Sequence, residues 1–138
     1  MSIALQAGDL VDQKYKIVRF IGKGAWASVY EGINARIGRR VAIKVLSEEA
    51  IQKPGVMDRF EREAQAATRI DSPHVVHVFD LGVLGDGRPY IVMELLEGEN
   101  LGHQIQTRGS VSEARAIFYT IQALRGLAEA HAAGVTHR

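Results

Sequence analysis

The spacing of apolar residues changes along this chain of 138 residues, and this change constrains the fold more than any other feature. Between residues 15 and 46, and again between 75 and 93, apolar residues alternate with polar ones or form short runs bounded by turn residues, which is typical of β-strands. Between 57 and 70, and between 112 and 132, they recur every three or four residues, which is typical of helices. The pattern predicts an α+β fold with the order β-β-β-α-β-β-α-α.

The limits of the expected elements follow from turn and cap residues. The expected strands are 15–21, Ser28–Ile33, Val41–Leu46, Val75–Leu84 and Pro89–Met93, and the expected helices are 57–70, Leu101–Gln106 and Ser112–Ala132. Asp71-Ser72-Pro73 should end the first helix and Gly134 the last. Either Ser110 or Ser112 can cap the start of the last helix. We expect residues 1–14 to be an N-terminal leader.

A glycine-rich turn joins the first two expected strands, with the sequence Gly22-Lys23-Gly24-Ala25-Trp26-Ala27-Ser28-Val29. Glycines at these places let the backbone approach a ligand closely, and backbone N–H groups of such a loop can face phosphates. A strand follows the turn, whereas a dinucleotide-binding fingerprint needs a helix there. A Walker A loop is also excluded, because no Gly-Lys-[Ser/Thr] is present. A plain glycine-rich hairpin remains open at this point.

One lysine interrupts the apolar strand Val41–Leu46. Strand alternation places Lys44 on one face and Val41, Ile43 and Val45 on the other. Glu63 falls on the apolar stripe of the following helix, where an acid is costly unless it is paired. An ion pair between Lys44 and Glu63 would explain both residues, although each could also be an ordinary side chain in water.

Taken together, these motifs resemble the small lobe of the protein kinases. The resemblance covers about residue 15 to the end, and the residues in its motifs are most similar to those of the bacterial eukaryotic-like (Hanks-type) serine/threonine kinases. It rests on the glycine-rich turn, on Val41-Ala42-Ile43-Lys44, and on Glu63, 19 residues after Lys44 (63 − 44). Further matching pieces, in kinase order, are Arg62-Glu63-Ala64, Ser72-Pro73-His74-Val75-Val76, Tyr90-Ile91-Val92-Met93-Glu94 and Gly134-Val135-Thr136-His137-Arg138.

The resemblance implies a small lobe at 15–93 with a five-stranded antiparallel sheet and one packed helix, a hinge at 94–100, and the start of a large lobe at 101–138. It implies catalytic roles for Lys44, which would contact the α- and β-phosphates of ATP, and Glu63, which would orient it. Met93 would be the gatekeeper, and Asn100 lies where a ribose contact is often made. The residues implied to bind ATP are Ile21, Gly22, Lys23, Gly24, Ala25, Trp26, Ala27, Ser28, Val29, Ala42, Lys44, Met93, Glu94 and Leu96.

The chain departs from the kinase pattern in two ways. Ala27 replaces the third glycine of the loop, which should stiffen it slightly. The sequence stops at His137-Arg138, one residue before the expected catalytic aspartate, so we expect the Mg²⁺ ligands beyond residue 138 and no metal site within the chain. The resemblance thus implies a kinase that transfers the γ-phosphate of ATP to protein Ser or Thr, of which these residues alone are inactive.

Two other readings differ in class from an enzyme. One is a truncated nucleotide-binding or interaction module without catalysis, and the other is a regulatory kinase-like domain that binds partners but no nucleotide. A net charge of +1 gives no reason to expect nucleic acid or a membrane surface as partner. The absence of cysteine, of a signal peptide and of a membrane-spanning run fits the cytoplasm.

The last expected helix carries an apolar stripe of Ile117, Ile121, Leu124 and Ala128, which Phe118 and Leu127 widen. In a complete kinase, the resemblance implies that other segments cover this helix. We therefore expect the isolated chain to self-associate, to need a partner, or to fray from about Ser112 onward.

Overall fold

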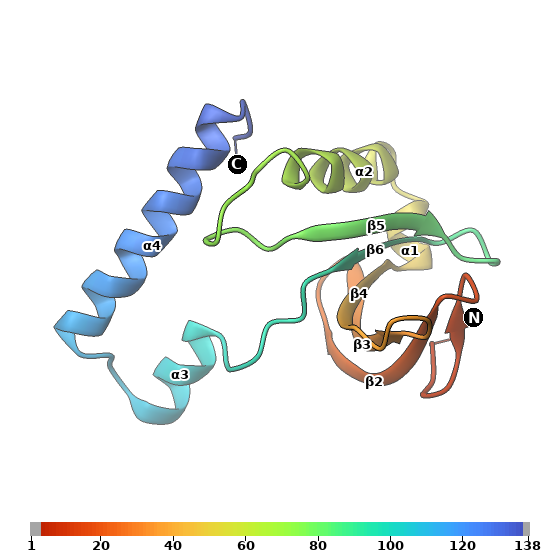
Figure 1. The fold of residues 1–138 in the computed structure, drawn as a ribbon, viewed down its shortest axis with the longest axis horizontal. Coiled ribbons are helices and arrows are strands. Elements are labelled where there is room, and N and C mark those ends of the chain that lie inside the picture. Colours follow the sequence, from red (N-terminus) through yellow and green to blue (C-terminus); the bar gives the residue numbers. More distant parts are fainter. Residues whose placement is uncertain (1–3, 137–138) are drawn as a thin grey trace.

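The computed structural model describes residues 4–136 and forms one curled antiparallel sheet with four helices among those residues (Figure 1). The strands are β1 (Leu10–Val11), β2 (Tyr15–Lys23), β3 (Ala27–Asn34), β4 (Arg40–Leu46), β5 (Val78–Val83) and β6 (Pro89–Met93). The helices are α1 (Glu48–Ile51), α2 (Val56–Ala67), α3 (Leu101–Arg108) and α4 (Glu113–Ala132). The expected α+β class and its order of main elements are confirmed.

The sheet has six strands in the order β1-β2-β3-β4-β6-β5, each antiparallel to its neighbours. Strand β4 lies between β3 and β6, so a residue on β4 has neighbours from strands on both sides. Register shifts in β2, between Ile17 and Arg19 and between Phe20 and Gly22, accompany the strong curl of this part of the sheet (Figure 1).

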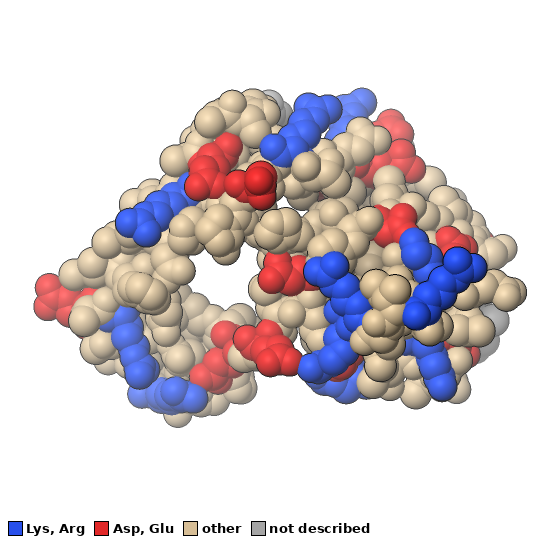
Figure 2. Space-filling model, viewed as in Figure 1, with Lys and Arg blue, Asp and Glu red and all other residues tan. Residues whose placement is uncertain are grey.

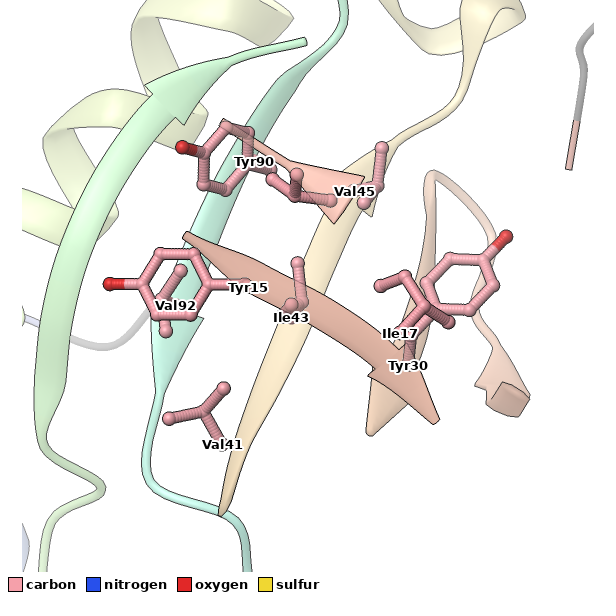
Figure 3. Close-up of a cluster of buried hydrophobic side chains, with 9 residues drawn as sticks. Tyr15, Ile17, Tyr30, Val41, Ile43, Val45, Tyr90 and Val92 are labelled. Carbon is pink, nitrogen blue, oxygen red and sulfur yellow. The ribbon is translucent and has the colours of Figure 1, made fainter. Parts of the chain in front are cut away.

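One face of the sheet holds the larger hydrophobic core (Figure 3). Its members alternate along the strands as the period-two pattern predicts: Val11, Tyr15, Ile17, Tyr30, Val41, Ile43, Val45, Tyr90 and Val92. Ile43 is completely buried at its centre. This core fixes the position of β4 and therefore the direction in which the residues on the other face of β4 point.

Helix α2 covers part of the opposite face (Figure 1). Phe60 and Ala64, four residues apart, pack with Leu46 of β4 and Ile91 of β6. Lys44 lies on this same face, with its ammonium 5.6 Å from the centre of the Phe60 ring. The expected separation of Lys44 from Ile43 and its neighbours is thus confirmed.

The structure corrects the expected number of strands, because residues 1–14 include a sixth. Asp12 and Gln13 adopt positive φ angles of 48° and 54°, which turn the chain so that β1 pairs with β2. Val11 is buried, and the Tyr90 hydroxyl donates a hydrogen bond to the Asp12 carboxylate. Strand β1 has only two residues, too few for a periodic pattern to reveal it, although it pairs with β2 across a local turn.

Local capping accounts for the helix boundaries. The Ser47 side chain accepts a hydrogen bond from the Ala50 N–H and so begins α1, which the sequence pattern did not predict. Ser112, rather than Ser110, caps α4, and Gly134 follows its end with a φ of 77°. The strand expected at Val75–Leu84 is β5, which begins at Val78. Helix α2 ends at Ala67 instead of residue 70.

Helices α3 and α4 form an arm that extends from the end of β6 (Figure 1). An opening separates much of this arm from the sheet in the space-filling view (Figure 2). The arm returns to the sheet region near His74, where an added Cβ at Gly126 would lie 3.0 Å from the His74 carbonyl oxygen. The stripe expected to be apolar is largely exposed in α4: Ile117, Phe118, Ile121, Leu124 and Leu127.

Candidate functional site

Four of the predicted ligand-binding side chains lie on the α2 face of the sheet, beside the area that α2 covers. Val29 is directly opposite Lys44, and Ala42 is directly opposite Met93, so all four side chains share one face. Ala42 is buried, whereas Val29, Lys44 and Met93 are half-buried. The arrangement is an apolar surface with one cation at its edge, which suits a flat apolar ring attached to an anion.

The glycine-rich loop closes as a tight hairpin tip at one end of this face. Lys23 pairs with Ser28, and the Gly24 N–H donates to the Ala27 carbonyl at 2.8 Å. The N–H groups of Ala25 and Trp26 make no hydrogen bond to any residue in the described part of the chain. These two donors are therefore available to an anion in front of the loop.

Internal packing does not explain the two loop glycines. An added Cβ at Gly22 would meet no protein atom within 4 Å, and one at Gly24 would meet only the Ala27 carbonyl oxygen at an ordinary 3.6 Å. By contrast, an added Cβ at Gly32 would lie 2.7 Å from the Ile43 side chain. The loop glycines thus fit a position that a ligand approaches closely.

The tip of the loop contacts residues on either side of α1. The Trp26 carbonyl accepts a hydrogen bond from the Ser47 N–H at 2.8 Å, and the Lys53 ammonium lies 4.1 Å from the centre of a Trp26 ring.

Lys23 and Ser28 line a cavity of about 380 Å³ together with Phe20, Tyr30 and Val45. That cavity lies toward the side of the sheet that carries Tyr30 and Val45, so these two loop side chains do not join the group around Lys44.

The residues after β6 present unpaired backbone groups. The Glu94 N–H donates to the His77 carbonyl at 2.9 Å, and the Glu94 carboxylate accepts from the His77 N–H at 3.3 Å. Hydrogen bonding by His77 lowers the pKa of Glu94. Within residues 4–136, no group hydrogen-bonds to the Glu94 carbonyl or to the Leu96 N–H. Both are therefore free to bind the edge of a planar ligand.

Lys44 and Glu63 do not form an ion pair in this structure. Glu63 is exposed and pairs with Arg59 one turn earlier in α2, with 3.1 Å between Arg59 Nε and Glu63 Oε1. Lys44 has no carboxylate partner among the described residues. The Lys44–Glu63 pair stays a prediction for another position of α2, because sequence spacing fixes the face of a helix but not its distance from a sheet.

A charged cluster beside this face was missed by sequence reasoning. Glu31 is only 4% exposed and lies directly opposite Ala42. Its carboxylate accepts hydrogen bonds from Arg40 at 2.9 Å and Arg19 at 2.7 Å, and the bond from Arg40 is the main reason that its pKa is lowered. The sequence did contain a signal of this cluster. Glu31 follows Ala27 and Val29 at every second position of the strand, so its side chain lies on their face of the sheet.

The described residues offer neither a metal-binding cluster nor a membrane-spanning helix. Across the described residues, no cluster of three or more His, Cys, Asp or Glu side chains is placed to hold a metal ion. No helix in that part of the chain has the length and apolar character that crossing a membrane requires. His137 and Arg138 of the kinase-like ending lie outside the described residues.

Comparisons with known proteins agree with this geometry. The family model described as "Protein kinase domain" matches residues 15–138. The chain is 40% identical over 136 residues to the probable serine/threonine-protein kinase pknA2 of Bifidobacterium longum, covering 96% of this chain and 18% of that protein. It is 36% identical over 137 residues to the serine/threonine-protein kinase PknA of Mycobacterium tuberculosis, covering 96% of this chain and 32% of that protein. The chain therefore spans a third or less of the length of these relatives.

Solved structures give the same result for the fold. The crystal structure of the M. tuberculosis PknI kinase domain matches with a TM-score of 0.85 and 28% identity. The match covers 98% of this chain and 54% of that one. The matched segment contains both the curled sheet and the α3–α4 arm, since only 2% of the chain lies outside it. The chain thus belongs to the protein kinase family, and its relatives are bacterial serine/threonine kinases whose kinase domain it matches over the N-terminal part.

Proposed function

We propose that this chain is the ATP-binding part of a serine/threonine protein kinase, which transfers the γ-phosphate of ATP to Ser or Thr of a protein. One observation carries the proposal: the Lys44 ammonium, without a carboxylate partner among the described residues, lies on the same sheet face as Val29, Ala42 and Met93. The relatives named as serine/threonine kinases support the reaction type.

Each of these groups has a separate task in the proposal. Val29 and Ala42 pack on the adenine ring, with Met93 behind it. The Glu94 carbonyl and the Leu96 N–H bind the edge of the base. The loop N–H groups of Ala25 and Trp26 and the Lys44 ammonium hold the phosphates, where charge-assisted hydrogen bonds are the strongest contributors. ATP, bound with Mg²⁺, supplies the phosphoryl group.

A titration tests nucleotide binding directly. We expect ATP to stabilise the 138-residue chain, because a ligand at 100 times its dissociation constant adds about 2.7 kcal/mol to the free energy of unfolding. Thermal unfolding at increasing ATP concentration measures this gain. An unchanged unfolding temperature up to millimolar ATP would contradict the proposal and favour the reading of a partner-binding domain without nucleotide.

A polypeptide of these 138 residues should bind ATP without transferring phosphate. Positioning and charge neutralisation supply nearly all of kinase catalysis, and from the resemblance we expect the catalytic aspartate and the metal ligands beyond residue 138. Incubation with labelled ATP, Mg²⁺ and a generic protein substrate should leave the substrate unlabelled. Labelling that disappears in Lys44→Ala would contradict this prediction, since it would show that the chain has its own catalytic groups.

Helix α4 should be the least protected part of the isolated 138-residue chain. Five of its large apolar residues are 37% to 61% exposed, and each large apolar side chain left in water loses up to about 1.5–3 kcal/mol of burial. We propose self-association through this stripe or fraying of α4. Hydrogen exchange should show faster exchange in α4 than in β4, and light scattering should show assemblies that Leu124→Glu reduces. A monomer with equal protection in α4 and β4 would contradict this prediction.

We also propose a cytoplasmic location for these residues. ATP, the proposed ligand, is abundant in the cytoplasm, and the chain contains no cysteine that an oxidising compartment would pair. The proposed protein partner is the Ser/Thr substrate of the whole kinase. No nucleic acid is proposed as a partner, because the net charge is only +1.

A further inference from the structure

The segment that contains the unpaired base-binding groups is fixed to the sheet at two points. We call residues 94–100 the hinge segment. At its start, Glu94 is tied to His77 by the backbone hydrogen bond of 2.9 Å and by its carboxylate. Three residues later, the Glu97 carboxylate accepts a hydrogen bond from Arg40 Nη1 at 2.7 Å. The Glu94 carbonyl and the Leu96 N–H lie between these two ties.

Apolar packing fixes this stretch of the hinge segment only in part, through half-buried Leu95. The Leu96 side chain is 65% exposed, and residues 94–100 belong to no helix or strand. A backbone without ladder or core contacts opens locally at low cost. The ion pair at Glu97 is therefore the contact that restrains the chain just after Leu96.

Arg40 is itself held in one orientation by Glu31. Arg40 directs Nε and Nη2 to the same Glu31 oxygen, each at 2.9 Å, which leaves Nη1 to face Glu97. The guanidinium is planar and rigid, so fixing two of its nitrogens fixes the direction of the third. Arg19 holds the other Glu31 oxygen at 2.7 Å and keeps this nearly buried carboxylate in place.

The register of the sheet places this cluster at the border of the proposed adenine site. Glu31 is directly opposite Ala42, and Ala42 is directly opposite Met93, the residue before the hinge segment. Lys44 is two residues from Ala42 toward the glycine-rich loop, whereas Arg40 is two residues away in the other direction. The cluster thus adjoins the base end of the proposed site and not the phosphate end.

We propose that Arg40, oriented by Glu31, is a positioning residue that fixes the hinge segment through Glu97, so that the Glu94 carbonyl and the Leu96 N–H face the adenine base. The inference rests on the proposed function, because it requires adenine at this edge. It predicts a specific defect: weakening the tie should reduce recognition of the base and leave phosphate binding unchanged.

The test compares two ligands on the 138-residue chain by calorimetric titration: ATP, and inorganic tripolyphosphate, which has no base. Glu97→Ala should weaken ATP binding about threefold, as expected for loss of an exposed ion pair, and should not change the affinity for tripolyphosphate. Arg40→Lys should behave in the same way, since the single ammonium of lysine cannot reproduce the separate, rigidly placed nitrogens that bond to Glu31 and Glu97. In about 1 M NaCl, which screens exposed pairs, the difference between Glu97→Ala and the unmodified chain should disappear.

Glu99→Ala is the matched control, because Glu99 lies in the same segment but pairs with Arg108 of α3 at 2.8 Å. It should bind both ligands as the unmodified chain does. Equal weakening of ATP and tripolyphosphate in Glu97→Ala would show a general loss of structure and overturn the inference, as would no weakening of either. If the unmodified chain binds tripolyphosphate but not ATP, or neither, the proposed function itself fails, and the inference with it.

Discussion

Replacing Ile43 with alanine should lower the free energy of unfolding by about 2–5 kcal/mol. Ile43 is fully buried in β4, within the core that also contains Tyr30 and Tyr90. Its loss leaves a cavity that the neighbouring strands cannot fill without moving, since β4 is paired on both sides. Urea unfolding followed by circular dichroism measures the effect, which is a large part of the total stability of a typical domain.

The matched control is Ile37→Ala, which makes the same chemical change at an exposed site. Ile37 is 70% exposed in the turn between β3 and β4, so Ile37→Ala should change stability by no more than about 0.5 kcal/mol. Equal effects of the two substitutions would contradict the core as described. The comparison also concerns function, because the strand that Ile43 anchors carries Lys44 on its other face.

Replacing Lys44 with methionine should weaken ATP binding by about 10–100-fold, which corresponds to the roughly 1.5–3 kcal/mol of a hydrogen bond to a charged group. Methionine retains an unbranched chain against Phe60, so the stability should change little. Lys16→Met is the control, since Lys16 is an exposed lysine on β2. An unchanged dissociation constant for ATP in Lys44→Met would show that the phosphates lie elsewhere.

Much of this fold can be predicted from local pattern. The alternation in Val41–Leu46 correctly separates Ile43, in the core, from Lys44, on the α2 face. The limits of β6 and the cap and end of α4 also follow from nearby residues. These features are set by the alternation of side chains along a strand, by side-chain hydrogen bonds within one helical turn, and by glycine at a positive φ. All three depend only on residues close together in the sequence.

The remainder depends on contacts between distant residues. Beyond the local pairing of β1 with β2, the turn after β1 is joined to β6 by the hydrogen bond between Asp12 and Tyr90, 78 residues apart. The orientation of Arg40 depends on Glu31, nine residues earlier, and on Glu97, 57 residues later. No local pattern encodes these long-range pairings. The strand face of Glu31 was a local signal of the charged cluster beside the candidate site, but the partners of Glu31 and Arg40 come only from the structure.

Glu63 illustrates a different limit. It lies in α2 as expected, but its side chain is exposed instead of lying on the buried stripe, and its carboxylate bonds to Arg59 instead of Lys44. An exposed pair of this spacing contributes only about 0.3–0.5 kcal/mol, so losing the bond to Arg59 would cost little if Glu63 met another cation. Sequence spacing identifies the residue, while the position of the helix decides which cation it meets.

A titration of the ¹⁵N-labelled chain with ATP, followed by amide NMR, tests the central claim most directly. We predict that the largest shifts occur at Ala25, Trp26 and Leu96, whose N–H groups make no hydrogen bond within the described residues. Tripolyphosphate should shift only the first two, since it lacks the base. Shifts confined to the residues around the 380 Å³ cavity, such as Lys23 and Glu49, would place the ligand on the wrong face of the sheet and contradict the account.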